Sequence, residues 1–319
     1  MHYINSESQL NTLVLQADTL YVLTGNVTYA ASTGIPVSSP SAVFDGRGYT
    51  ITVAEGVTNL PGFFLGGCTV MNLNVAAASS ALAIGGGWIF GPGVTGATVK
   101  GCSSSGAIPE GGGGILGSDC SGCTVDRCYS TGIIGVNAGG IVGQNVHNTN
   151  VTSSYSTGVN AADNGGGIYG PSANNCLAQN CFSSSGVGGV GGVGGIFTTS
   201  STDCIVANCY TVNYSGLGGN TVSNSITGTK WQDTVAKRIL IDSGSIWNVT
   251  GGDKVWSLQS TPPLNRKQRV YWPTSSELTA DRKPCACACS RCSATRVYAT
   301  NADRLRNIRC QIRKNSSQS

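Results

Sequence analysis

A repeat of about 27 residues constrains this chain more than any other feature of its sequence. Six segments of similar sequence align between residues 68 and 209, and their last positions are 29, 26, 26, 27 and 28 residues apart. A second anchor, Gly-Gly-Ile, moves with the first, because its isoleucines at positions 115, 141, 168 and 196 are 26, 27 and 28 residues apart. Two anchors that drift together indicate a structural repeat.

The period predicts an all-β, right-handed parallel β-helix. One coil needs about three strands of roughly five residues plus short turns, which sum to the mid-twenties. Helical repeats are longer and need apolar stripes with a period of 3.6, and the repeat lacks such stripes. The composition agrees, because 46 of 319 residues are Gly and only 11% are charged. Short strands joined by tight turns suit this mixture.

Stacked coils place equivalent residues on top of one another, so the alignment predicts interior ladders. We interpret the cysteines of these ladders as buried thiols that act as small hydrophobic groups, rather than as disulfides or metal ligands. The Gly pairs are expected to be turns with positive φ or points of close packing. The first predicted column contains Cys68, Ala97, Cys123, Thr149, Cys176 and Cys204, and the second contains Leu73, Cys102, Cys128, Ser154, Cys181 and Cys209.

Several motifs resemble known β-helix families. Residues 44–51, Phe-Asp-Gly-Arg-Gly-Tyr-Thr-Ile, look like the opening strand of pectate-lyase-like β-helices, with Tyr49 where that family has His. The Gly-Gly-Ile-Val-Gly and Cys-Tyr-Ser-Thr-Gly units resemble GLUG-type repeats of bacterial surface adhesins and of some large DNA virus proteins. The Trp-rich stretch after residue 230 is similar to the cap that closes such repeats. The resemblance implies an architecture and leaves the function open.

The sequence suggests four regions. Residues 1–65 are expected to form the N-terminal cap and first coils, with extended strands at residues 20–23 and 27–29. Residues 66–225 are expected to form the Gly/Cys-rich coils. A Trp-rich C-terminal cap is expected over residues 226–275, because a solenoid must cover both open ends. Residues 276–319 form a basic, Cys-rich arm.

The arm carries an excess of positive charge. Residues 281–319 hold nine Lys/Arg and two Asp, a net charge of +7, so the remainder of this chain of net charge +4 is about −3. A short helix is expected after residue 300, with apolar residues on one face. Such a helix suits an acidic partner, a nucleic acid or an anionic membrane, or it is simply a solvated tail. The arginines expected to contact a partner are Arg291, Arg296, Arg304, Arg306, Arg309 and Arg313.

The cysteines of the arm allow three interpretations. Disulfides would staple a segment that has little core. A metal site with four cysteine ligands is the second interpretation, although the spacing is tight for one tetrahedron. Free or intermolecular thiols are the third. The four closely spaced residues are Cys285, Cys287, Cys289 and Cys292.

The sequence offers no catalytic constellation. Residues 96–224 contain five carboxylates in different repeat columns, and none forms an Asp-Asp or Asp-x-Asp pair. His147 lies in an Asn-rich turn and is expected to be a surface residue. We therefore predict a protein that is not an enzyme and needs no cofactor.

These observations favour a structural protein. The absence of a recognisable export signal or membrane span, the rigid repeat and the basic arm predict a minor capsid or virion component of a large DNA virus. Its expected partners are other capsid proteins or copies of itself, and no specific nucleic acid. The alternative is a surface adhesin or carbohydrate-binding β-helix at the cell surface, and a polysaccharide lyase or hydrolase comes third.

Overall fold

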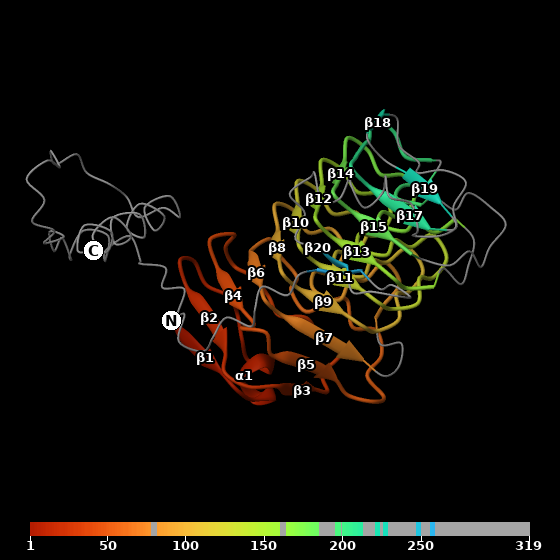
Figure 1. Cartoon of the computed structure of the whole chain (residues 1–319). Helices are drawn as coiled ribbons and strands as arrows, with labels where there is room; N and C mark the ends of the chain where they lie inside the picture. Colours follow the sequence, from red (N-terminus) through yellow and green to blue (C-terminus); the bar gives the residue numbers. More distant parts are fainter. Residues whose placement is uncertain are drawn as a thin grey trace, which may run out of the picture. The chain divides into compact units, whose positions relative to one another are not determined.

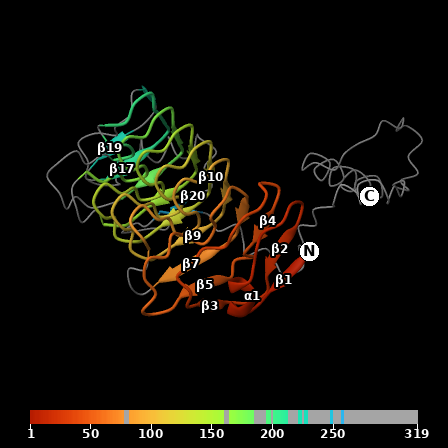
Figure 2. The same cartoon turned by 180° about the vertical axis from the view of Figure 1, so that it is seen from behind.

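The protein is an all-β parallel solenoid of about 7 turns with about 26 residues per turn, as the repeat predicts. We describe it from a computed structural model. The structure describes residues 1–77, 82–159, 164–184, 195–198 and 200–212, together with four short strands farther along the chain. Figures 1 and 2 show its successive coils from two sides.

Two parallel sheets form two sides of the solenoid. In each sheet the strands follow one another in the order of the coils. The ten-stranded sheet contains β1 (His2–Ile4), β2 (Leu20–Leu23), β4 (Val43–Asp45), β6 (Thr69–Met71), β8 (Thr98–Lys100), β10 (Thr124–Asp126), β12 (Asn150–Thr152), β14 (Leu177–Gln179), β16 (Ile205–Ala207) and β18 (Thr221–Ser223). The nine-stranded sheet contains β3 (Val27–Tyr29), β5 (Thr50–Val53), β7 (Asn74–Ala77), β9 (Ser103–Ser104), β11 (Tyr129–Ser130), β13 (Tyr155–Ser156), β15 (Phe182–Ser183), β17 (Tyr210–Val212) and β19 (Ile226–Gly228).

Single bridges between coils form the third side. One row pairs Phe64 with Phe90, Phe90 with Leu116, Leu116 with Val142 and Val142 with Tyr169. Just before this row in each coil, the isoleucines of the Gly-Gly-Ile anchors are fully buried and bond from coil to coil; the Ile115 N–H, for example, donates to the Ile141 carbonyl at 2.8 Å.

The N-terminal end begins the solenoid and covers it. The predicted strands at residues 20–23 and 27–29 are present as β2 and β3, and β1 adds one more strand to the ten-stranded sheet. The short helix α1 (Glu7–Asn11) lies at this end and contacts β3. Its Glu7 carboxylate accepts the N–H of Ala30 at 2.7 Å, just after β3 ends.

Left-handed turn residues bend each coil at the corners. Between the two sheets, Asn72, Arg127, Asn180 and Asn208 have φ between 52° and 55°. Asn and Asp tolerate this backbone region better than other non-Gly residues, because their short side chains bond locally. Their amides also stack, as where the Asn208 Nδ2 donates to the Asn180 Oδ1 at 3.2 Å.

The described glycines of the Gly-Gly-Ile anchors are points of close packing, and none of them has a positive φ. A Cβ atom built on Gly140 would lie 2.2 Å from the Gly167 carbonyl oxygen and 2.3 Å from the Ser156 Oγ. That serine belongs to a buried polar column of the nine-stranded sheet that the repeat alignment did not predict. The column contains Ser104, Ser130, Ser156, Ser183 and Thr211.

The predicted C-terminal cap is described only in part. β20 (Trp247–Val249) and β21 (Trp256–Leu258) form an antiparallel pair within it. The other residues between 229 and 275, with Trp231, lie outside the described residues.

Candidate functional site: cysteine ladders and outer faces

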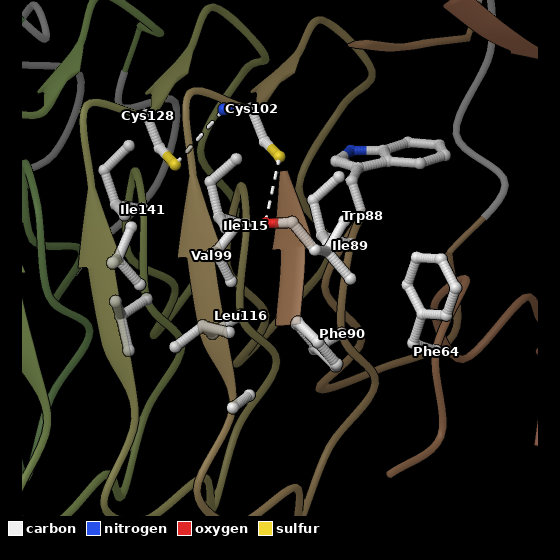
Figure 3. Close-up of a cluster of buried hydrophobic side chains, with 14 of the residues drawn as sticks. Phe64, Trp88, Ile89, Phe90, Val99, Cys102, Ile115, Leu116, Cys128 and Ile141 are labelled. Carbon is white, nitrogen blue, oxygen red and sulfur yellow. Dashed lines mark hydrogen bonds between the residues drawn. The ribbon is translucent and has the colours of Figure 1, made fainter. Parts of the chain in front are cut away.

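The second cysteine column runs through the interior at the corner between the two sheets. Strand register aligns the residues that precede Asn74, Ser103, Tyr129, Tyr155 and Phe182, so the predicted column stacks in the order given by the sequence. All its members are buried, with exposed fractions of 1% or less. Figure 3 shows Cys102 and Cys128 side by side above the apolar layer of Val99, Ile115 and Ile141.

The first column lies at the opposite end of the ten-stranded sheet. Its members directly precede Thr69, Thr98, Thr124, Asn150 and Leu177, which pair in register. They are also buried, with exposed fractions of 2% or less. Between the two columns, the centres of the strands supply an apolar ladder made of Phe44, Val70, Val99, Val125, Val151, Ala178 and Val206.

Several column residues satisfy buried backbone groups as well as filling space. They follow a turn, and their N–H groups point into the interior, where the side chain of the next coil accepts them. The Cys102 N–H donates to the Cys128 Sγ at 3.4 Å (Figure 3), and the Cys128 N–H donates to the Ser154 Oγ at 3.1 Å. A buried N–H without an acceptor is costly, so Cys, Ser or Thr is favoured wherever the coil before it donates such an N–H.

The same side chains also donate within their own coil. The Cys128 Sγ donates to the Asp126 carbonyl at 3.4 Å, and the Ser154 Oγ makes the equivalent bond to the Thr152 carbonyl at 2.8 Å. In the first column, the Thr149 Oγ1 donates to the His147 carbonyl at 3.0 Å. The shared geometry explains why threonine can replace cysteine in the first column and serine can replace it in the second.

The ladder thiols differ in how readily they ionise. Burial raises the pKa of the Cys68 thiol to about 12. Burial, and next the contact with Cys102, raises the pKa of Cys128, and burial with the contact to Cys181 does the same for Cys209. The hydrogen bond with Cys120 lowers the pKa of Cys123 to about 7, and the hydrogen bond with Cys176 lowers the pKa of Cys204. Because the thiolate is the nucleophile and the metal ligand, Cys68, Cys128 and Cys209 are unreactive in the folded solenoid.

Cys120 is a further ladder residue that the repeat alignment did not assign to a column. It is fully buried, and its Sγ lies 3.5 Å from the Gly91 carbonyl oxygen of the preceding coil. The hydrogen bond with Cys123, followed by burial, raises its pKa. No group of three potential metal ligands occurs among the described residues.

Outside the ladders, the ten-stranded sheet presents a row of side chains that face away from the core. Every second residue of each strand points outward. The first residues of these strands form one outward row, and their side chains are half-buried or exposed. The second row includes the exposed Lys100 and the half-buried Asp126. The first outward row contains Thr69, Thr98, Thr124, Asn150, Leu177 and Ile205.

Three carboxylates in the described part of the coils have local partners. Asp126 forms an ion pair with Arg127 at 2.9 Å and accepts the Thr152 hydroxyl at 3.0 Å. Asp119 accepts the Ser118 hydroxyl at 2.6 Å. In the strand that resembles the pectate-lyase opening, Asp45 accepts the Arg47 N–H and the amide of Asn72.

His147 lies exposed on the surface, as the sequence suggests. It is part of a row of single bridges with Ser121 in the preceding coil and Asn174 in the following one.

The predicted sites in the arm lie outside the described residues. This applies to the four closely spaced cysteines, to the six arginines and to the expected helix. Within the described residues, no helix is long and apolar enough to cross a membrane.

Fold and interior together define a class: a cysteine-rich parallel β-solenoid built from short repeats. The sequence matches no family model and no curated protein. Among solved structures, the chain is similar to a Bacteroides ovatus protein described as a "putative immunoglobulin A1 protease". The similarity has a TM-score of 0.49 at 18% identity, and it covers 81% of this chain and 91% of the other.

Proposed function

We propose that this chain is a non-enzymatic structural protein that contacts neighbouring proteins through the outer face of its ten-stranded sheet. The observation that carries the proposal is the outward row on this face, from Thr69 to Ile205, whose spacing is fixed by the buried ladders beneath it. A stack of coils with a filled interior holds such a face rigid, which suits repeated contacts in an assembly.

The local bonding of the carboxylates supports a structural function. Polysaccharide-cleaving enzymes need two carboxyl groups that converge on one bond. In the described coils, Asp126 forms an ion pair with Arg127 and accepts a hydrogen bond from Thr152, and Asp119 accepts a hydrogen bond from Ser118. These groups stabilise turns and strand ends instead of facing one another.

We further propose that the assembly is the virion of a large DNA virus, with the protein as a minor capsid component. Support comes from the resemblance of the Gly-Gly-Ile-Val-Gly and Cys-Tyr-Ser-Thr-Gly units to GLUG-type repeats. The arm, whose residues 281–319 carry a net charge of +7, would add contacts to acidic neighbours.

Fractionation of the native protein, combined with cross-linking mass spectrometry, tests the proposal. Lys100 projects from the outer face and provides a reactive amine there, while Lys283 and Lys314 report on the arm. We expect co-purification with particles and cross-links from Lys100 to another capsid protein or to a second copy. A soluble protein without such cross-links would contradict the proposal, and binding on a glycan array would then favour the adhesin alternative.

A further inference from the structure

Three pairs of cysteines occupy equivalent positions in neighbouring coils. The paired residues Ser103 and Tyr129 directly follow Cys102 and Cys128, so these two cysteines are stacked neighbours. The same reasoning from the paired strands β14 and β16, and from β15 and β17, gives the other two pairs. The three pairs are Cys102–Cys128, Cys176–Cys204 and Cys181–Cys209.

The geometry of stacked coils suits a covalent bond between these side chains. Neighbouring parallel strands lie about 4.8 Å apart. Disulfides join residues whose Cα atoms are about 4.4–6.8 Å apart and whose Cβ atoms point in compatible directions. The Cys181 N–H donates to the Cys209 Sγ at 3.4 Å, so the sulfur of one coil is already in contact with the cysteine backbone of the coil before it.

We propose that these three pairs are latent disulfides that staple adjacent coils when the protein meets an oxidising small-molecule disulfide. One cysteine thiolate attacks the oxidant to form a mixed disulfide and releases one thiol. The stacked cysteine then attacks the mixed disulfide and releases the second thiol. Overall, the two protein thiols lose two hydrogens, and the oxidant is reduced to two thiols. The inference concerns the interior of the solenoid and does not rest on the proposed structural function.

The reaction depends on transient opening of a coil. All six cysteines have exposed fractions of 2% or less. The folded solenoid therefore shields them, and local opening exposes them without global unfolding. Oxidation is slow in buffer and faster at urea concentrations below the unfolding transition.

Cys68 provides an internal control within the same ladder. Its neighbours in the column are Ala42 and Ala97, so it has no stacked thiol to bond with. It is as buried as the paired cysteines, with an exposed fraction of 1%. Burial alone therefore cannot distinguish it from the six paired residues.

The test uses the full-length chain with the cysteines of the arm replaced. The reduced protein is incubated with oxidised glutathione in urea below the transition and then alkylated. Trypsin and chymotrypsin digestion is followed by mass spectrometry. A parallel Cys128→Ser chain is the matched control, and a Cys176→Ser chain separates the two pairs that share digestion fragments. The replacements in the arm are Cys285→Ser, Cys287→Ser, Cys289→Ser, Cys292→Ser and Cys310→Ser.

We expect three cross-linked peptide pairs, with Cys68 alkylated throughout. The Cys128→Ser chain loses only the bond to Cys102, and the Cys176→Ser chain keeps the Cys181–Cys209 bond. The urea midpoint of the oxidised protein rises and returns to its starting value when reductant is added. Alkylation of all six paired cysteines to the same extent as Cys68 would overturn the proposal. Cross-links between cysteines that are not stacked would overturn it as well.

Discussion

A cysteine that follows a left-handed turn can perform two functions in this solenoid. It fills the narrow corner of a coil, and it can accept the inward N–H of the coil before it, as the Cys128 Sγ does for Cys102. The interpretation of the cysteines as small hydrophobic groups was therefore incomplete. The occurrence of Ser154 and Thr149 in the same columns was the available signal, since hydroxyl groups need partners in a buried site.

Substitution of Cys128 tests this account of the ladder. Cys128→Ala leaves the Cys102 N–H without an acceptor, and we expect the free energy of unfolding to fall by about 1–3 kcal/mol. Cys128→Ser restores the acceptor and should recover most of that loss. Cys68→Ala is the matched control, because the preceding residue of the column, Ala42, donates its N–H to the Ser39 carbonyl, so no N–H loses its partner. Urea unfolding under reducing conditions measures all three, and equal losses for Ala and Ser at Cys128 would contradict the account.

The close packing at the Gly pairs gives a second prediction. Gly140→Ala drives a Cβ against the Gly167 carbonyl and Ser156, and we expect a loss of about 1–3 kcal/mol or more in the free energy of unfolding. A Cβ on Gly25 would meet nothing within 4 Å, so Gly25→Ala should be close to neutral. Thermal unfolding compares the two variants. If neither substitution lowers the free energy of unfolding, the coils are not closely packed at Gly140, and the account of the Gly pairs is wrong.

At the scale of elements, α1 protects the edges exposed at the N-terminal end. The Gln9 side chain runs along the free edge of β1, where its Nε2 donates to the Tyr3 carbonyl at 3.3 Å and its Oε1 accepts the Asn5 N–H at 2.8 Å. It thereby takes the place of a neighbouring strand. Because open sheet edges recruit other chains, this contact limits end-to-end association.

Removal of the Gln9 amide should therefore promote self-association. We expect Gln9→Ala to form dimers or longer species in a concentration-dependent way, while Ser8→Ala, an exposed neighbour on α1, stays like the parent chain. Sedimentation velocity at several concentrations distinguishes the two. Identical profiles for both variants would show that the edge is blocked by other means.

At the scale of the whole molecule, the sequence predicts the fold well because the same pattern of residues recurs in each of several coils. The period and the parallel all-β architecture follow from the spacing of the repeat, and β2 and β3 could be expected from their extended apolar sequences. The serine column and the Gln9 contact did not follow, because each depends on which side chain meets which backbone group in space. The left-handed turns at Asn180 and Asn208 could have been found, since each Asn directly precedes a cysteine of the second column.

The stability of the whole solenoid should fall at alkaline pH. The pKa of Cys68 is raised from 9.0 to about 12 by burial, so the unfolded chain loses this proton first as pH rises. The contribution of the Cys68 thiol to the free energy of unfolding is fully present below pH 9 and is lost progressively as the pH rises towards 12. Urea unfolding between pH 8 and 10.5 should show this decline, and Cys68→Ala should reduce its slope by up to about 1.4 kcal/mol per pH unit. A slope unchanged by the substitution would contradict the prediction.

Deletion of one complete coil tests the solenoid most directly. Removing residues 129–154 joins Cys128 to Tyr155, which occupies the position of Tyr129 in the next coil, so every column closes again in register. We expect this chain to keep its β-sheet circular dichroism and a cooperative urea transition. Removing residues 129–141 shifts the columns by half a coil and should abolish cooperative unfolding. If the complete-coil deletion unfolds as readily as the half-coil deletion, the stacked-ladder account is wrong.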